Sequence, residues 1–305
     1  MSNMRVVAVV PARAGSKGIP GKNLRSVAGR SLVRRAVESG RAARLVDGVV
    51  VSTDGDAIAD EASAAGARVV RRPADLAGDG ASSESALLHV LDALQTDGIE
   101  PEVLLFLQAT SPFIDPNDLD DAVARVLGGS ADAVFAAAPS HAFLWRTDED
   151  GHAVAVNHDA STRPRRQDRD PEYRETGAFY ALRTDGFRRH RHRFFGRVEL
   201  SPVDARGAID IDDPADLTLA AALAPQLDAR GDTQHGNTER GDTQRDDTQR
   251  GDPQHSDTWR GDTRPDATRP DATQRGDPRR QHAQRPSAPA HDPQRWPLAT
   301  TNGAP

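Results

Sequence analysis

An apolar run passes directly into a glycine-rich loop in Val6-Val-Ala-Val-Val-Pro-Ala-Arg-Ala-Gly-Ser-Lys-Gly-Ile-Pro-Gly-Lys-Asn23, and this segment is the most informative one for the fold. The run predicts a buried strand, and the three glycines let the loop backbone approach a ligand closely. The only two lysines of the chain, Lys17 and Lys22, stand in this loop, although 39 residues are lysine or arginine. A compact ammonium group reaches a single phosphate oxygen, so the loop predicts a phosphate-binding turn.

The glycine spacing excludes two familiar phosphate motifs. Glycines at every third position do not fit the G-x-G-x-x-G dinucleotide pattern, and Gly18 is not followed by the Lys-Ser/Thr pair that ends a Walker loop. The alternative is an ordinary strand-to-helix turn whose lysines are solvated, since charged loop residues are usually exposed.

Short apolar runs alternate with amphipathic stretches along the first two thirds of the chain. The predicted strands are 6–10, 48–51, 68–70, 103–107, 133–137 and 177–182. The predicted helices are 31–44, 56–65, 83–94, 116–127 and a helix from Pro214 toward Leu223. This alternation predicts right-handed βαβ units, and therefore an α/β fold with a three-layer, mostly parallel sheet.

Ligands of such sheets bind at the carboxyl ends of the strands. The residues that follow the predicted strands include Arg13, Lys17, Lys22, Arg72 and Gln108. They collect positive charge at one edge of an otherwise acidic domain. This edge therefore predicts a site for an anionic ligand such as a nucleoside triphosphate.

A second motif, Ile209-Asp-Ile-Asp-Asp-Pro214, suggests a metal site. As a strand it would place Asp210 and Asp212 on one face, and Mg²⁺ prefers carboxylate oxygens. Mn²⁺ could replace Mg²⁺ on such ligands. The alternative is that Asp212 or Asp213 caps the following helix, which would account for one of the three aspartates.

The chain divides into a folded part, 1–228, and a low-complexity tail, 229–305. The tail repeats Arg-Gly-Asp and has no Val, Ile, Phe or Tyr, so it cannot bury enough surface to fold. Truncation after Leu227 is therefore predicted to leave stability and turnover unchanged. Within the folded part, residues 140–176 mix charged and aromatic residues and predict a lid or dimerisation excursion.

Composition narrows the functional classes. The tail is balanced in charge, so the net charge of −7 belongs to the folded part, which argues against nucleic-acid binding. No cysteine is present for a disulfide or a thiolate ligand. The run 6–10 is too short for a signal peptide and no apolar span of membrane length exists, so we expect a cytoplasmic protein without a membrane partner.

Seven motifs, in order between about residue 5 and residue 224, together resemble the acylneuraminate cytidylyltransferases, the CMP-sialic acid synthetases. They are Pro11–Asn23, Val51-Ser-Thr-Asp54, Arg72-Pro-Ala-Asp-Leu76, Gln108-Ala-Thr-Ser-Pro112, Arg163-Pro-Arg-Arg-Gln-Asp168, Glu175-Thr-Gly-Ala-Phe-Tyr180 and Ile209-Asp-Ile-Asp212. The resemblance implies a nucleotide-diphospho-sugar transferase fold, which is Rossmann-like. It also implies transfer of CMP from CTP to the anomeric hydroxyl of a nine-carbon sugar acid, with release of pyrophosphate.

The resemblance also assigns roles to individual residues. The implied phosphate, nucleotide and catalytic contacts are Arg13, Lys17, Lys22, Asn23, Arg72, Ala81, Ser83 and Gln108, with Asp210 and Asp212 as the Mg²⁺ ligands. The implied sugar contacts are Arg165, as the catalytic arginine, with Arg166, Tyr180, Phe194 and Phe195. Because the family contributes an aromatic pair across a dimer interface, a homodimer is also implied. Thr176 departs from the family, which often has Asn at this place.

Three alternatives stay open. The nearest is the same reaction on legionaminate, pseudaminate or 3-deoxy-manno-octulosonate, although the Ser16-Lys17-Gly18 loop favours nine-carbon acids over the octulosonate branch. A nicotinamide-dependent reductase is a second alternative, and the missing G-x-G-x-x-G pattern argues against it. A third is a non-catalytic nucleotide-sugar binding protein in which the repeat tail is the working part.

Overall fold

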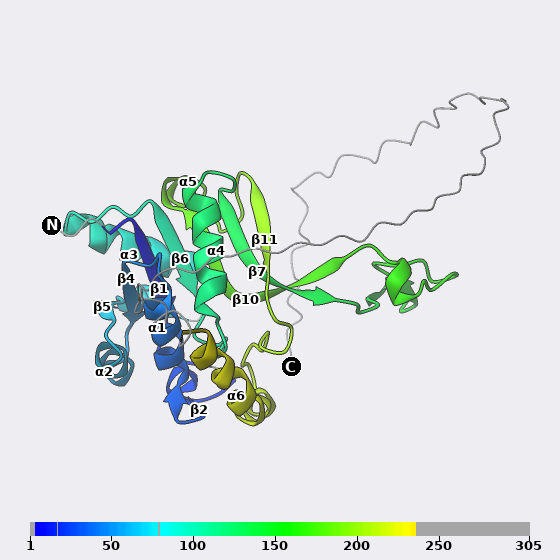
Figure 1. Ribbon diagram of the computed structural model, residues 1–305, viewed down its shortest axis with the longest axis horizontal. Helices are drawn as coiled ribbons and strands as arrows, with labels where there is room; N and C mark the ends of the chain where they lie inside the picture. The colour runs from blue at the N-terminus through cyan, green and yellow to red at the C-terminus, as the bar shows by residue number, and fades with distance from the viewer. Residues whose placement is uncertain (1–3, 17, 79, 236–305) are drawn as a thin grey trace, which may run out of the picture. The chain divides into compact units, whose positions relative to one another are not determined.

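A computed structural model describes residues 4–16, 18–78 and 80–235. They contain a seven-stranded sheet with strand order β11-β7-β10-β6-β1-β4-β5 (Figure 1). The strands are β1 (Val6–Pro11), β4 (Gly48–Thr53), β5 (Arg68–Arg71), β6 (Val103–Leu107), β7 (Ala133–Ser140), β10 (Glu172–Arg183) and β11 (Val198–Pro202). All pairings are parallel except those of β10 with β6 and β7. The predicted mostly parallel α/β sheet is therefore confirmed.

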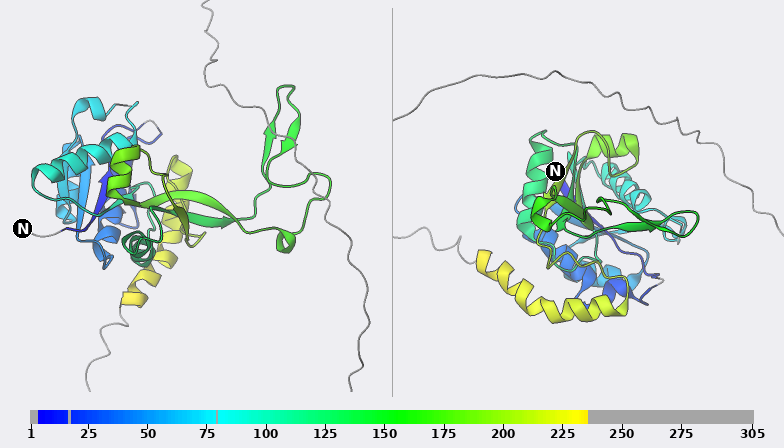
Figure 2. Two further views of the ribbon diagram at one scale, coloured as in Figure 1. Left: turned by 90° about the horizontal axis from the view of Figure 1, so that it is seen from above. Right: turned by 90° about the vertical axis from the view of Figure 1, so that its right-hand side faces the viewer.

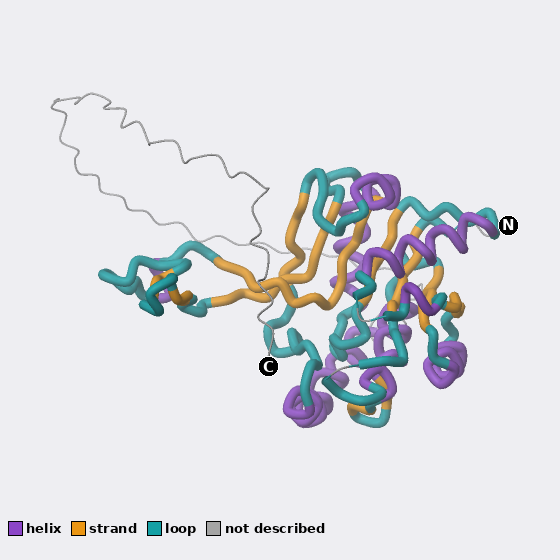
Figure 3. The backbone as a smooth tube through the Cα atoms, turned by 180° about the vertical axis from the view of Figure 1, so that it is seen from behind, coloured by secondary structure: helices purple, strands orange, loops and turns teal. Residues whose placement is uncertain are grey.

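Helices cover both faces of the sheet (Figures 1 and 3). They are α1 (Leu32–Ala42), α2 (Asp56–Ala64), α3 (Ser83–Thr96), α4 (Pro116–Leu127), α5 (Thr184–His190) and α6 (Pro214–His235). Alternate residues of β1 point to opposite faces, so Ala8 packs in one core with α1, α2 and α4, while Val7 packs in a second core with α3 and α5. The shorter elements are η1 (Lys22–Leu24), β2 (Ser26–Val27), β3 (Arg30–Ser31), η2 (Ala74–Leu76), β8 (Trp145–Thr147), β9 (Ala153–Ala155) and η3 (Arg166–Asp168).

A third apolar cluster attaches α6 to the glycine loop rather than to the sheet. It joins Ile19 of the loop, Ile211, and Ala220 and Ala224 of α6, all of which are buried. The segment around Ile211 is not a strand, so the predicted strand over 209–212 is wrong. The segment makes one backbone hydrogen bond beside the sheet, from Ile211 N to Thr110 O at 2.9 Å, which is not a strand ladder.

The predicted excursion at 140–176 is an arm made by two strands that continue beyond the main sheet (Figure 2). The start of β10 pairs with the end of β7, with Glu172 opposite Ser140. The register of this pair shifts between Glu175 and Tyr180, and Gly177 has a φ of +76° within the irregularity. A bulge of this kind bends a strand and re-aims its side chains. The β8/β9 hairpin lies within the arm.

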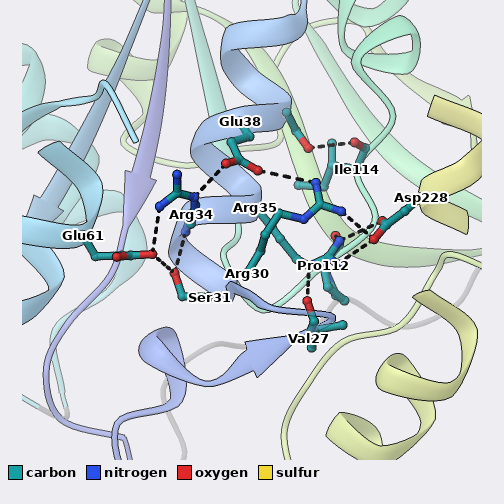
Figure 4. Close-up of polar contacts among 11 residues, drawn as sticks. Val27, Arg30, Ser31, Arg34, Arg35, Glu38, Glu61, Pro112, Ile114 and Asp228 are labelled. Carbon is teal, nitrogen blue, oxygen red and sulfur yellow. Dashed lines mark hydrogen bonds and ion pairs between the residues drawn. The ribbon is translucent and has the colours of Figure 1, made fainter. Parts of the chain in front are cut away.

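Helix α6 continues past the predicted boundary at residue 228 and reaches His235. Its Asp228 forms a bidentate pair with Arg35 of α1, from Nη1 to Oδ1 at 2.9 Å and from Nη2 to Oδ2 at 2.8 Å (Figure 4). Arg35 is only 4% exposed. The expectation that everything beyond Leu227 is dispensable is therefore revised: Asp228 belongs to the folded part. Residues 236–305 lie outside the described residues.

Candidate active site

The glycine loop leaves β1 at the carboxyl edge of the sheet and is held from several sides. Ala14 N donates to Asp54 Oδ1 at 2.8 Å, just beyond the end of β4. Asn23 Nδ2 returns to the start of the loop and donates to Arg13 O at 2.9 Å. Gly21 has a φ of +62°, a conformation that residues with a Cβ atom rarely adopt. These contacts hold the turn in place, although Lys17 lies outside the described residues.

Lys22 follows Gly21 and points into the site rather than into solvent. Its side chain is 15% exposed, and its Nζ donates to Ile211 O at 2.8 Å and to Asp212 Oδ1 at 3.1 Å. A Cβ atom at Gly18 would collide with the carbonyl oxygen of Asp212, so glycine is required there for the two loops to meet. The phosphate loop and the aspartate motif, 190 residues apart, are thus in direct contact.

These loops surround a cavity of about 520 Å³. The predicted site residues that line it are Arg13, Lys22, Asn23, Arg72, Ala81, Ser83, Gln108 and Asp212. They come from the loops that follow β1, β5 and β6, from η1, from the start of α3 and from the segment before α6. The rim predicted from strand ends therefore exists as one cavity. Ser82 and Thr110 also line it and were not predicted as contacts, and Ser16, named from the sequence only as part of the loop, lines it too.

Arg72 contributes positive charge from a half-buried position. Its Nη2 donates to Ser52 O at 2.9 Å and its Nε to Ser52 Oγ at 3.2 Å, which fixes the guanidinium plane. Burial lowers the pKa of Arg72, and repulsion from Arg13 adds to this, while Asp54 opposes it. Arg13 donates to Gly78 O at 3.2 Å. Two guanidinium groups close enough to repel each other favour an anion between them.

The aspartate motif separates into different roles. Asp213 caps α6, because its Oδ1 accepts from Ala215 N at 2.7 Å and from Asp216 N at 3.2 Å. Asp216 Oδ2 in turn accepts from Asp213 N and Asp212 N at 2.9 Å each. This reciprocal arrangement is a capping box. One of the three aspartates is thus a helix cap, as the alternative interpretation stated.

The two proposed metal ligands differ in position. Asp212 lines the cavity and its carboxylate is 77% exposed, while Asp210 is exposed but does not line the cavity. No group of three metal-binding side chains occurs within the described ranges. Mg²⁺ needs only one or two carboxylates when phosphates and waters complete its coordination, so this donor set fits it.

The predicted sugar contacts do not line the cavity. Tyr180 is 2% exposed, stacks on Phe106 at 5.3 Å and donates from its hydroxyl group to Glu175. Burial, together with that hydrogen bond, raises the pKa of Tyr180 to about 12. Phe194 lies beside Tyr180 at 6.0 Å and is 36% exposed, whereas Phe195 is 8% exposed. Phe195 is therefore a core residue of its own chain.

Arg165 and Arg166 lie in the arm, away from the cavity. Arg165 Nε pairs with Asp168 Oδ2 at 2.7 Å, and its side chain is 75% exposed. The structure thus places the predicted nucleotide contacts around the cavity, Arg165 and Arg166 on the exposed arm, and Tyr180 and Phe195 in the core. A second cavity, of about 550 Å³, lies between α1, α4, β10 and α6 and is lined by none of the predicted site residues.

Among the residues that the structure describes, no helix combines the length and apolar character needed to cross a membrane. The cationic cavity at the carboxyl edge of a mostly parallel sheet defines an α/β protein of the class that binds an anionic ligand beside a glycine loop. The family model described as cytidylyltransferase matches residues 7–200. The chain belongs to this family.

Two curated relatives and one solved structure show the extent of the likeness. The chain is 36% identical over 178 residues to an N-acylneuraminate cytidylyltransferase of Oncorhynchus mykiss, covering 57% of this chain and 40% of the relative. It is 36% identical over 154 residues to the CMP-N,N'-diacetyllegionaminic acid synthase of Legionella pneumophila, covering 50% of this chain and 66% of the relative. The chain therefore spans between 40% and 66% of the length of these relatives.

The fold also matches solved structures. A CMP:2-keto-3-deoxy-manno-octonic acid synthetase, solved in complex with CTP, superposes with a TM-score of 0.55 at 18% identity. The match covers 73% of this chain and 99% of that structure. This likeness confirms the predicted nucleotidyltransferase-type fold.

Proposed function

We propose that the protein transfers CMP from CTP to the anomeric hydroxyl of a sialic-acid-type, nine-carbon sugar acid and releases pyrophosphate. The observation that carries the proposal is the single cavity that collects Arg13, Lys22 and Arg72 around the glycine loop. Three fixed cations suit a triphosphate, and membership of the cytidylyltransferase family supports cytosine as the base.

In this reaction the hydroxyl oxygen attacks the α-phosphorus of CTP, and the bond from that phosphorus to the pyrophosphate oxygen breaks. Arg13 and Lys22 neutralise the charge that builds on the departing pyrophosphate, with Lys17 and Asn23 as further phosphate contacts. Arg72, the backbone of Ala81 and Ser83 hold the cytidine portion. Gln108, whose amide lies against Gly177 of the β10 bulge, stands between nucleotide and sugar.

Lys22 has to exchange partners when CTP binds. Its ammonium group now contacts the Asp212 carboxylate at 3.1 Å, and a phosphate oxygen competes for the same hydrogens. Moving Lys22 onto phosphate leaves Asp212 without its counter-charge. Asp212, with Asp210 or waters, would then hold Mg²⁺, which when bound would supply positive charge for the phosphate oxygens and make the attacking hydroxyl group more acidic.

The sugar side of the site, with Arg165, Arg166, Tyr180, Phe194 and Phe195, is supported by the resemblance of the motifs. We also propose a homodimer, in which the arm of one copy approaches the cavity of the other. The exposed apolar side chains of the arm support this, since Leu144 is 51% and Trp145 is 52% exposed. The burial of Phe195 leaves Phe194 as the aromatic residue of this pair that is available to a second copy.

Thr176 does not line the cavity of the glycine loop. It is 6% exposed and its hydroxyl group donates to Ala136 O at 3.2 Å, so it supports the bulge of β10. Legionaminate is kept as a second candidate, because of the 36% identity to the Legionella synthase. The cytoplasmic location stays a prediction.

The test is pyrophosphate release from CTP with a panel of sialic, legionaminic, pseudaminic and octulosonic acids and with Mg²⁺. The expected result is release with a nine-carbon acid, dependent on CTP and abolished in Lys22→Gln. The matched control is Arg206→Gln, which removes an exposed cation paired with Asp204 outside the cavity. CTP binding in wild type without turnover on any acid would refute the reaction and keep only nucleotide binding.

A further inference from the structure

Arg193, in the segment after α5, contacts the first turn of α3 and the rings of Tyr180 and Phe106. Its Nε donates to Glu84 Oε1 at 2.8 Å, and Glu84 is the second residue of α3. Its guanidinium carbon lies 4.6 Å from the ring centroid of Tyr180 and 5.2 Å from that of Phe106. Glu84 and Arg193 are 109 positions apart, so only the fold brings them together.

The ion pair is shielded from water. The side chains of Arg193 and Glu84 are 18% and 14% exposed. Arg188 of α5 also pairs with a residue of α3, but this ion pair is more exposed. Arg188 contacts Asp92 at 2.6 Å, and the side chains are 33% and 65% exposed. Breaking a shielded pair leaves a charge without a partner, whereas an exposed pair contributes little.

The contacts of Arg193 lead to the cavity on one side and to Tyr180 on the other. Glu84 follows Ser83, and both Ser83 and Phe106 line the cavity. The hydroxyl group of Tyr180 donates to Glu175, where the β10 bulge begins. One guanidinium group therefore touches the first turn of α3, the end of β6 and the strand beside the bulge.

We propose that Arg193 is a positioning residue that holds the nucleotide wall, at the start of α3, in register with the sugar wall at Tyr180. It acts through its neighbours, since it does not line the cavity. The inference rests on the proposed function, which places the sugar acid beside Tyr180. It adds a residue that belongs to none of the seven motifs.

The geometry needs arginine rather than any cation. A planar guanidinium group stacks on aromatic rings and keeps its edge nitrogens for a carboxylate at the same time. A lysine ammonium group reaches Glu84 but does not cover the two rings. Arg193→Lys therefore separates the two attachments: it keeps the link to α3 and loses the hold on Tyr180.

The test compares wild type, Arg193→Gln, Arg193→Lys and the control Arg188→Gln, by KM for each substrate, kcat and the calorimetric Kd for CTP. In Arg193→Gln both KM values rise about tenfold while kcat falls less than about threefold, because a positioning group acts mainly on binding. In Arg193→Lys the CTP KM stays within about twofold and the sugar-acid KM rises about fivefold. Arg188→Gln stays within about twofold of wild type throughout.

The inference is overturned if Arg193→Gln matches Arg188→Gln, or if Arg193→Lys equals wild type for both substrates. If Arg193→Gln loses its near-ultraviolet circular dichroism and does not fold, Arg193→Lys decides by the same split between the two KM values. Failure of the proposed function is a separate result: wild type then releases no pyrophosphate with any sugar acid. In that case a Kd for CTP that is raised in Arg193→Gln and unchanged in Arg188→Gln would still support the proposal that Arg193 positions the start of α3.

Discussion

The ion pair between Asp228 of α6 and Arg35 of α1 gives the most specific stability prediction. Replacing Asp228 with Asn keeps the size of the side chain but removes the charge that Arg35 and Arg30 share (Figure 4). Truncation after Leu227 removes the same carboxylate. Both changes are expected to destabilise the protein, whereas truncation after His235 keeps Asp228 and leaves stability unchanged.

The magnitude follows from burial. Arg35 is 4% exposed, and removing one partner of a buried pair costs about 3–5 kcal/mol. Two features reduce this figure: the Asp228 side chain is 27% exposed, and Arg35 keeps the carbonyl oxygens of Val27 and Pro112 as acceptors at 3.0 and 3.4 Å. We therefore expect a loss of about 2–4 kcal/mol, or a Tm lower by about 4–16 °C for a domain of this size.

The pH dependence gives an independent check. Burial alone would raise the pKa of Asp228, but the hydrogen bonds and charges of Arg35 and Arg30 outweigh it, so the pKa is lowered. A carboxyl group with a lowered pKa stabilises the folded state above its unfolded value of about 3.9, and the effect is lost as the pH falls through the folded pKa. The difference between wild type and Asp228→Asn should be full near pH 7 and should shrink below about pH 4.

The measurement is urea unfolding at several pH values, with equal m-values required for the comparison. Asp75→Asn is a suitable control, because no ion pair is found for Asp75 in the described part of the chain. The reasoning is refuted if Asp228→Asn unfolds at the wild-type urea concentration at pH 7. It is also refuted if truncation after Leu227 is no more harmful than truncation after His235.

Three further predictions concern the cavity. Lys22→Arg should cost about 1–3 kcal/mol in kcat/KM while the fold is kept, because a longer, planar guanidinium group cannot take the place of the compact ammonium group that contacts Ile211 O and Asp212; wild-type turnover would show a solvated lysine. Asp212→Asn should reduce kcat on the order of 10²-fold, and high Mg²⁺ or Mn²⁺ should partly restore it. Asp210→Asn should lose less activity, because Asp210 does not line the cavity. Full activity in both variants would show that the metal binds elsewhere. Gly18→Ala should raise the KM for CTP about tenfold, since its Cβ atom collides with Asp212 O, and an unchanged KM would show that the loops separate freely.

The strands and helices of the first half of the chain were predictable because the hydrophobic pattern of each segment matches its burial in the fold. The predicted strand 103–107 and helix 116–127 have the bounds of β6 and α4, since every residue of β6 is buried and α4 begins with an Asp-Pro signal. Elements without such a signal were missed. The edge strand β11 contains Glu199 and ends at Pro202, and α5 is short and rich in charge.

The strand predicted at 209–212 failed for a different reason. Its alternation of Ile and Asp correctly predicts which side chains are buried, with Ile211 inside and Asp210 exposed. Alternation does not supply a neighbouring strand, however, and in the described residues this segment makes only one backbone hydrogen bond to the loop at Thr110. The periodicity of this segment therefore predicted correctly which side chains are buried, but it predicted wrongly that the segment pairs with a strand.

The candidate site was predictable as far as strand ends determine it. Arg13, Arg72 and Gln108 meet because parallel strands end at one edge. The Arg193–Glu84 pair could not be predicted in this way, since neither residue ends a strand that reaches the cavity. Composition placed the end of the folded part at residue 228, but it could not show that Asp228 makes an ion pair with Arg35, 193 positions away, so truncation after Leu227 was expected to be harmless.

Helix α6 connects the stability prediction to the site. Its first turns pack through Ala220 and Ala224 on Ile19 of the glycine loop and on Ile211, whose carbonyl oxygen accepts from Lys22. Near its other end, Asp228 attaches it to α1. Because the apolar cluster is buried independently of the ion pair, losing Asp228 should leave α6 seated against the loop at temperatures well below Tm. CTP affinity in Asp228→Asn should therefore stay close to wild type although Tm falls, and a parallel loss of affinity would mean that the ion pair, rather than the apolar cluster, sets the position of Lys22.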